Sequence, residues 1–408
     1  MKERKIVIIG GGASGLVAAI TASRAGAQVT VLEKLASVGK KILATGNGRC
    51  NMTNEEQGAH HYHCADPAFV TPAFKAFDYA KTIAFFHEIG VETLQLNGSK
   101  IYPLSLQASS VVDLLRDEAQ NLGVDIHINS NVTAIKQLKK GFSVATEAGG
   151  ALQADKLLIA TGGKAAEHLG SDGAGYAFAK TFGHAVTSLF PTLIQLRSDA
   201  KYLKKIAGVK FEGRVTLLID GKVVQSEEGD VLFTDYGVSG NTVIDISRRA
   251  AKALEEKREV KVRLNLLKMF DRKELDAMML RRFENRPKKS LTFSLVGLVN
   301  KKLAPVIVNE VIGEDKFAAQ TSKKERLRLV DFMQNWELDI TGTQEFKRAE
   351  ATAGGVRVDE VDAQTMESKK VKGLYFAGEV LDVDGDCGGY NLQWAWSSGY
   401  LAGSSMTD

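Results

Sequence analysis

The sequence predicts an α/β fold in which one domain is built from both ends of the chain and interrupted by two insertions. Three observations predict it. An apolar strand at residues 5–9, a glycine turn, a small-residue helix at about 14–25 and a strand at 28–32 form one βαβ unit. The middle of the chain is first β-rich and then helical. A short apolar strand bounded by glycines, at residues 373–378, returns near the C-terminal end.

Changes in residue pattern place the domain borders. Residues 1–190 and 346–408 are predicted to form the discontinuous domain, residues 191–270 a β-rich insert and residues 271–345 a helical insert. Within the first segment we expect helices at 67–89 and 109–122, and strands at 124–128, 131–138, 141–147 and 151–160.

Composition excludes several classes of protein. The 408 residues are 44% hydrophobic and 25% charged, which excludes a disordered, collagenous or disulfide-scaffold chain. The net charge is only +4, and paired lysines are dispersed along the chain. The densest basic segment, 281–289, is predicted to be the solvated face of a helix, so nucleic acid is not the expected partner.

Cysteine usage and hydropathy predict a compartment. The three cysteines form no C-x-x-C pair, which favours a reducing, cytoplasmic environment. Residues 6–23 carry no charge and resemble a signal peptide or membrane span. Four glycines interrupt that stretch, so a buried strand, turn and helix explain it better, and no membrane association is predicted.

A dinucleotide fingerprint follows the first strand. Residues 10–15 match G-x-G-x-x-G, in which Gly10 permits a tight turn, Gly12 lets the backbone approach a pyrophosphate and Gly15 allows close packing of helix on strand. Glu33 ends the second strand 23 residues after Gly10, where an acid binds ribose hydroxyls and favours FAD or NAD over NADP. The alternative is a glycine turn without a ligand.

Other motifs indicate which of the two cofactors, FAD or NAD, the chain binds. The chain has one complete fingerprint, and the nearest second candidate, residues 170–175, has different spacing. Residues 157–163, with Gly162 in the turn, resemble the strand-to-glycine turn of two-dinucleotide-fold flavoproteins. Residues 373–379 resemble the C-terminal flavin motif of the same proteins, in which an acid binds the ribityl chain. Together these motifs predict FAD.

A glycine-rich loop enters the last predicted helix at residues 384–394. Free N–H groups near Asn391 and Leu392 would suit the flavin edge where negative charge accumulates on reduction. An ordinary glycine-rich helix entry is the alternative explanation.

Four segments resemble one family, the bacterial flavoproteins grouped with aminoacetone oxidase and BaiN-type 3-dehydro-bile acid reductases. These segments are residues 39–54, 232–240, 353–356 and 378–393, and the resemblance covers nearly the whole chain. It implies noncovalent FAD on a Rossmann-like domain of the two-dinucleotide-fold type, with an inserted β-barrel-like domain and a helical region over the isoalloxazine. The FAD contacts that it implies are Ser14, Glu33, Lys34, Lys41, Gly48, Asn51, Val132, Gly378, Glu379, Asp386, Asn391, Leu392 and Gln393.

One position departs from the family pattern. Relatives usually have proline where this chain has Asn241, after the Ile/Val-Ser-Gly of the insert. The departure concerns a turn in the insert, so it weakens inference about the substrate more than about the cofactor.

Three further groups of residues have side chains that could carry chemistry. His60–His61–Tyr62–His63–Cys64 holds several potential metal ligands, but no partner motif completes a site, so no metal is predicted. Cys50 and Cys387 lie in loops expected to flank the flavin, where small packing residues are favoured over a redox disulfide. Tyr236, Ser239, Asn241 and Tyr390 are candidate pocket residues, and none is assigned a catalytic role.

The predicted function is that of an FAD-dependent oxidoreductase that passes a hydride between a small organic substrate and flavin N5. In one version NAD(P)H is a transient co-substrate and an unsaturated ketone is reduced. In the other, O2 reoxidises the flavin and an amine or amino ketone is the substrate. The alternatives are a flavoprotein that acts on tRNA through the basic helical insert and a non-catalytic flavin-binding protein.

Overall fold

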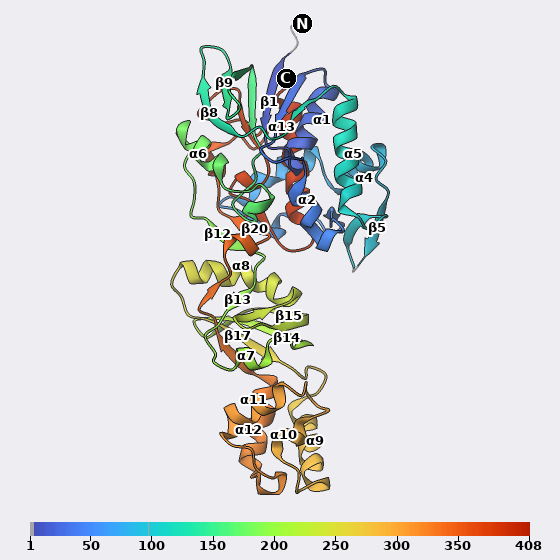
Figure 1. Cartoon of the computed structure of the whole chain (residues 1–408), viewed down its shortest axis with the longest axis vertical. Coiled ribbons are helices and arrows are strands. Elements are labelled where there is room, and N and C mark those ends of the chain that lie inside the picture. The colour runs from blue at the N-terminus through green and yellow to red at the C-terminus, as the bar shows by residue number, and fades with distance from the viewer. Residues whose placement is uncertain (1–3, 97) are drawn as a thin grey trace. The chain divides into compact units, whose positions relative to one another are not determined.

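The computed structural model describes residues 4–96 and 98–408, and the chain divides into two compact units (Figure 1). Unit 1 comprises Met1–Pro191 and Phe346–Asp408, and unit 2 comprises Thr192–Glu345. Each unit has its own hydrophobic core.

A five-stranded parallel sheet forms the centre of unit 1. Its strand order is β21-β11-β1-β2-β7, and every neighbouring pair is parallel. The strands are β1 (Lys5–Ile9), β2 (Gln28–Leu32), β7 (Asp125–His127), β11 (Lys156–Ile159) and β21 (Leu374–Phe376). Burial on both faces explains why β1 and β11 are runs of Val, Ile and Leu without alternation. The predicted α/β fold class is confirmed.

Two long helices from opposite ends of the chain pack together beside this sheet. They are α1 (Ala13–Arg24) and α13 (Tyr390–Ser405). A Cβ at Gly399 would lie 2.4 Å from the carbonyl oxygen of Ser14, so the glycine lets the two backbones approach. This contact brings the C-terminal segment next to the first glycine turn.

Smaller elements complete unit 1. The remaining helices are α2 (Lys40–Ala44), α3 (Thr71–Ala76), α4 (Tyr79–Glu88), α5 (Ala108–Asn121) and α6 (Ala174–Thr181). The remaining strands are β3 (Thr53–Asn54), β4 (Tyr62–His63), β5 (Thr93–Leu96), β6 (Lys100–Pro103), β8 (Val132–Gln137), β9 (Phe142–Thr146), β10 (Ala151–Ala154), β12 (Phe190–Thr192), β20 (Ala351–Ala353) and β22 (Asp384–Gly385).

Two segments of unit 1 that were each predicted to be one element are divided in the structure. The expected helix at 67–89 is broken after Ala76, because Phe77 has φ −144° and the Asp78 side chain accepts the Lys81 N–H to start α4 anew. The expected strand at 151–160 is two strands. β10 pairs with β9 in an antiparallel sheet, whereas β11 lies in the parallel sheet.

The strands of unit 2 close into a barrel-like sheet. The order is β18-β17-β14-β15-β16-β13-β19, and its two outer strands follow each other in the chain. The Ile340 N–H bonds to Val260 on one side and the Thr341 N–H to Arg197 on the other, which joins the two edges. The strands are β13 (Leu196–Arg197), β14 (Lys210–Ile219), β15 (Lys222–Phe233), β16 (Gly237–Ser239), β17 (Val260–Asn265), β18 (Trp336–Asp339) and β19 (Gly342–Thr343).

The helices of unit 2 include one that the sequence analysis did not predict. They are α7 (Leu203–Ile206), α8 (Asn241–Glu255), α9 (Arg272–Asn285), α10 (Leu291–Leu295), α11 (Leu303–Ile312) and α12 (Lys323–Gln334). The prediction of a β-rich insert at residues 191–270 is wrong over α8. Its first half is rich in β-branched residues, which favour strands, but Val243, Ile246 and Ala250 place one apolar face on the sheet. Strands and helices share one core around Trp336.

An acid-sensitive cap begins α12. Glu325 accepts hydrogen bonds from the backbone and hydroxyl of Ser322, and Lys316 Nζ lies 2.6 Å from its Oε1. The hydrogen bond from Lys316 and those from Ser322 lower the pKa of Glu325 from 4.5 to about 2. This cap therefore stabilises unit 2 fully above pH 4.5, and its contribution is lost as the pH falls through about 2.

We expect Glu325→Gln to lower the free energy of unfolding by about 1 kcal/mol at pH 6 and to flatten the stability loss between pH 4.5 and 2. Thermal unfolding followed by circular dichroism measures both effects. Glu314→Gln, at an exposed acid without an ion pair in the described structure, is the control. Identical acid profiles for wild type and Glu325→Gln would contradict the assignment.

Within the described residues, no helix has the length and apolar character needed to cross a membrane.

Candidate functional site

The main pocket of unit 1 opens where the carboxyl ends of the parallel strands meet the glycine turn. It contains about 1190 Å³ of non-protein space, part of it open to solvent, which suits an elongated ligand. The strand ends supply Ile9, Leu32 and Ala160, and the first residues of β8 and α13 supply Val132 and Asn391. Ligands of open parallel sheets bind at such edges.

The glycine turn is built for close backbone approach. Gly10 has φ +108°, and a Cβ there would lie 2.4 Å from the carbonyl oxygen of Ala160. A Cβ at Gly15 would lie 2.0 Å from the carbonyl oxygen of Gly10. By contrast, a Cβ at Gly12 would meet no atom within 4 Å, because this residue faces the pocket. Gly10 and Gly15 therefore allow the close backbone approach that their spacing predicts, whereas the pyrophosphate contact of Gly12 stays a prediction.

Glu33 ties the turn to the second strand. Its carboxylate accepts the Gly11 N–H at 2.9 Å and the Leu35 N–H at 2.8 Å, and the residue is only 9% exposed. Each carboxylate oxygen keeps a second lone pair that can accept a further hydrogen bond, and Glu33 lines the pocket. Lys34 beside it pairs with Asp172 at 2.6 Å.

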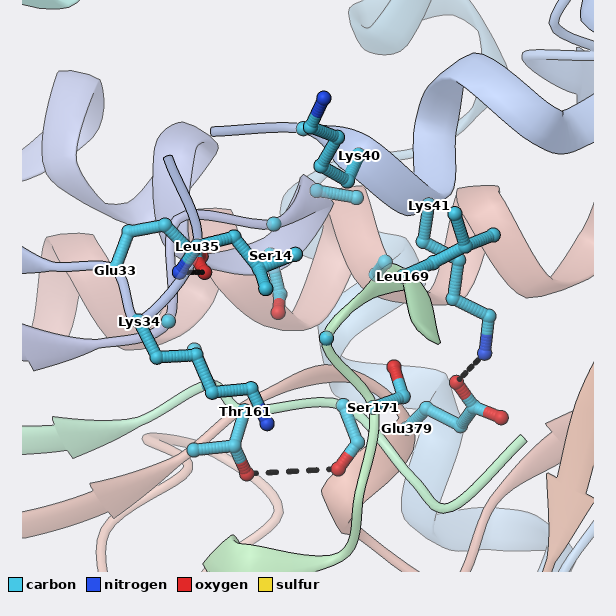
Figure 2. Close-up of a pocket in the computed structure, with 18 of the residues that line it drawn as sticks. Ser14, Glu33, Lys34, Leu35, Lys40, Lys41, Thr161, Leu169, Ser171 and Glu379 are labelled. Carbon is cyan, nitrogen blue, oxygen red and sulfur yellow. Dashed lines mark hydrogen bonds and ion pairs between the residues drawn. The ribbon is translucent and has the colours of Figure 1, made fainter. Parts of the chain in front are cut away.

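An ion pair occupies the other side of the pocket. Figure 2 shows Glu33 and Lys34 on one side and Lys41 with Glu379 on the opposite side. Lys41 Nζ lies 2.6 Å from Glu379 Oε2, and Glu379 Oε1 accepts the Thr352 N–H at 2.7 Å. The pair joins two segments that the sequence analysis assigned to the same ligand although they lie 338 residues apart.

The start of α13 presents backbone donors to the pocket. Asn391 uses its side chain on the loop, where Oδ1 accepts the Gly385 N–H and Nδ2 donates to the Gly385 carbonyl oxygen. Asn391 and Leu392 belong to the first turn of the helix, whose N–H groups have no intrahelical acceptor. Beside them, Asn51 Oδ1 is buried without a hydrogen-bond partner.

The structure brings most of the predicted cofactor contacts to this pocket. Those that line it are Gly10, Gly12, Ser14, Glu33, Lys34, Lys41, Val132, Gly162, Glu379, Asn391 and Leu392. Gly15, Gly48, Asn51, Gly378, Asp386 and Gln393 are not among its lining residues. As cofactor contacts, all of these residues remain predictions.

The side chains of Gln393 and Asp386 are engaged elsewhere. Gln393 is fully buried and bonds to Thr53, Thr82 and Ser397. Asp386 bonds to His63 Nε2 at 2.7 Å and His61 Nδ1 at 3.1 Å. Burial raises the pKa of Asp386, but the hydrogen bonds and charges of His63 and His61 outweigh it, so the net pKa is lowered.

The cysteines form no disulfide bond in the described residues. Burial raises the pKa of Cys50 to about 12 and that of Cys64 to about 11. No group of three or more His, Cys, Asp or Glu side chains that could hold a metal occurs between residues 4 and 96 or 98 and 408.

Sequence reasoning missed several lining residues. Thr161, Leu169, Ser171 and Asp172 come from the β11–α6 connection. The near-fingerprint at residues 170–175 could have signalled them, because it supplies residues to this pocket. Tyr236, Ser239, Asn241 and Tyr390, the other candidates, are not among the residues lining it.

Comparison with known proteins identifies the family. The model described as "HI0933-like protein Rossmann domain" matches residues 4–405. The chain belongs to the HI0933-like family. It is 42% identical to the 3-dehydro-bile acid delta(4,6)-reductase of Clostridium scindens over 99% of each chain. It is also 32% identical to the ribosomal RNA dihydrouridine synthase of Haemophilus influenzae over 98% of each chain.

A solved structure agrees with the fold. The 3-ketosteroid delta1-dehydrogenase of Sterolibacterium denitrificans superposes with a TM-score of 0.51 at 12% identity and covers both chains completely. The predicted family resemblance is confirmed, and the predicted class of flavin-dependent oxidoreductase agrees with a relative named as a reductase.

Proposed function

We propose that this HI0933-like protein is an FAD-dependent reductase that saturates a carbon–carbon double bond conjugated to a carbonyl group. The main support is the pocket of unit 1, which runs between the glycine turn with Glu33 and the first turn of α13. The residues fit the cofactor, because Gly12 leaves open space for a pyrophosphate, and Asn391 and Leu392, in the first turn of α13, line the same pocket.

The chain's residues would hold FAD without a covalent bond. Glu33 would accept hydrogen bonds from the ribose hydroxyls while it keeps its own bonds to backbone N–H groups. The N–H groups that begin α1 would donate hydrogen bonds to the pyrophosphate. Lys41 and Glu379 would lie along the ribityl chain, and the N–H groups of Asn391 and Leu392 would stabilise negative charge at the ring edge. Bound there, FAD supplies hydride transfer chemistry.

The names of the relatives support the reaction class. A 3-dehydro-bile acid delta(4,6)-reductase and a dihydrouridine synthase both add two hydrogen atoms across an unsaturated carbon–carbon bond conjugated to a carbonyl group. This shared chemistry favours the reductase version of the predicted function, with NAD(P)H as the electron source, over the O2-using oxidase of amines or amino ketones.

Two candidate substrate classes follow from this reaction. The 42% identical relative supports a small unsaturated ketone. Two relatives named ribosomal RNA dihydrouridine synthase, at 32% and 31% identity over at least 98% of this chain, support a uracil base in RNA. The second class departs from the expectation that nucleic acid is not a partner.

Anaerobic absorbance spectroscopy tests the proposal. We expect the flavin bands of the purified protein near ~450 nm to bleach on addition of NADH or NADPH. A 3-oxo-4-ene steroid or a uridine-rich RNA should then restore them in the absence of O2. Bleaching reversed by O2 alone, with H2O2 formed from amines, would favour the oxidase. A colourless protein that cannot be reconstituted with FAD would overturn the proposal.

A further inference from the structure

A basic aromatic patch lies among the helices of unit 2. We use this name for Arg286, Lys288, Lys289, Phe293 and Phe317. Arg286 ends α9, the two lysines lie in the turn before α10, Phe293 is in α10, and Phe317 follows α11. All five are exposed, and the phenyl side chains are 58% and 54% exposed. Among the large hydrophobic residues that are exposed in the described structure, Phe293 and Phe317 are the aromatic ones.

Backbone pairing makes this patch continuous. Ser290 and Phe317 form an isolated antiparallel bridge, and the Ala318 N–H bonds to the Lys289 carbonyl oxygen at 2.8 Å. Lys289 Nζ lies 5.0 Å from the centroid of the Phe293 ring, a cation–π contact. Lys289, Phe293 and the segment that carries Phe317 are therefore neighbours, although they come from two separate parts of the chain.

The charges of the patch are free. Among the described residues, Arg286, Lys288 and Lys289 form no ion pair, whereas Arg214, Arg263 and Arg272 elsewhere in unit 2 each bond a carboxylate.

The acids around the patch do not neutralise it. Residues 281–296 contain five Lys and Arg and a single acid, Glu284. The adjoining segment carries Glu314 and Asp315, and Asp315 accepts the Thr292 N–H at 3.0 Å. The patch therefore keeps a local positive potential that attracts phosphates.

We propose that the basic aromatic patch binds single-stranded RNA, with its cations on phosphates and the rings of Phe293 and Phe317 stacked on unpaired bases. Exposed aromatic rings beside free cations are the combination that single-stranded nucleic acids require, because bases present flat faces and the backbone presents regular negative charge. This inference rests on the second candidate substrate class of the proposed reductase.

Membrane binding is the competing use of such a surface. Surface helices that bind lipid present a broad apolar face over several turns. In the patch, α10 has only five residues, and polar residues, Thr292 and Ser294, stand on both sides of Phe293 in the sequence. Isolated rings among hydrogen-bonding groups suit base stacking better than insertion into acyl chains.

The first test removes the rings. We expect Phe293→Ala/Phe317→Ala in the FAD-loaded protein to weaken binding of a fluorescent 12-nucleotide oligouridine at least tenfold, measured by anisotropy. Phe293→Tyr/Phe317→Tyr should bind like wild type because it keeps two flat rings. Val223→Ala, at a residue that is 62% exposed near the start of β15, is the control for loss of an exposed apolar group.

The second test removes charge. Each phosphate contact to a single strand contributes about −0.7 to the slope of log affinity against log salt, so Lys288→Gln/Lys289→Gln should make that slope shallower by about 1.4. The ring variants should leave the slope unchanged. Lys139→Gln/Lys140→Gln, an equally exposed lysine pair in unit 1, should match wild type in affinity and slope.

Three results would overturn the inference. They are absence of RNA binding by the wild type, equal binding by wild type and patch variants, and loss of binding to phosphatidylserine vesicles, rather than to RNA, in the patch variants. Bleaching of the wild-type flavin by NAD(P)H without RNA tests the reductase by itself. If the protein binds RNA but NAD(P)H does not bleach its flavin, only the proposed reductase activity is contradicted. If NAD(P)H bleaches the flavin but the protein does not bind RNA, only the proposed role of the basic aromatic patch is contradicted.

Discussion

Gly15→Val is expected to unfold unit 1 or to lower its free energy of unfolding by about 4 kcal/mol or more, the largest effect of any substitution in the glycine turn. The reason is steric. Even a Cβ at this position would lie 2.0 Å from the Gly10 carbonyl oxygen and 3.4 Å from the Ile8 side chain, so α1 must move away from β1. Denaturant unfolding and FAD content after purification measure the loss.

Gly12→Ala is the matched control for this prediction. Its Cβ would enter open pocket space, so the stability of the cofactor-free protein should change by less than about 1 kcal/mol. FAD binding should nevertheless weaken, because the added methyl group would stand where the backbone must approach a pyrophosphate. If both variants lost stability equally, the separate roles assigned to the two glycines would be wrong.

Glu33→Ala is expected to raise the FAD dissociation constant about 100-fold, roughly 3 kcal/mol. The substitution removes the acceptor proposed for the ribose hydroxyls, and it also leaves the N–H groups of Gly11 and Leu35 without their carboxylate partner. Titration of the cofactor-free protein with FAD, followed by flavin fluorescence, measures the change.

Two further variants, Glu33→Gln and Glu147→Gln, serve as the conservative substitution and the control for the FAD titration. Glu33→Gln keeps the size and one acceptor oxygen, so its dissociation constant should fall between those of wild type and Glu33→Ala. Glu147→Gln changes an exposed carboxylate in the β9–β10 turn but keeps an oxygen that can accept the hydrogen bond from Asn131, so it should leave affinity unchanged. Wild-type affinity in Glu33→Ala would remove this carboxylate from the proposed site.

Local patterns predicted the parts of the fold that depend on neighbours in sequence. The run of Val and Ile in β1, the glycine turn and the small residues of α1 specify a βαβ unit within about 30 residues. The helix α8 escaped prediction because its β-branched first half matches strand propensity. This segment is helical because a helix places its apolar face on the sheet of unit 2, and that packing outweighs the strand propensity.

In the candidate site, too, some features follow from local sequence and others depend on tertiary structure. Glu33 was predicted because its distance from Gly10 reflects the geometry of one βαβ unit. The place of Lys41 against Glu379 was not predictable, since their 2.6 Å ion pair depends on how chain segments far apart in sequence assemble. For Asp386, a cofactor contact that the family resemblance implies, the partners of the carboxylate also depend on tertiary structure, because it bonds to His61 and His63 from a distant part of the chain.

The sequence by itself determined the βαβ unit with its fingerprint, the family and the order of the segments along the chain. It did so because glycine spacing, strand burial and the motif at residues 39–54 are local properties. The tertiary structure decided which side chains share the pocket and which cations stay free of carboxylates on the basic aromatic patch. Those outcomes depend on contacts between separate segments, such as the bridge between Ser290 and Phe317, and no local pattern encodes them.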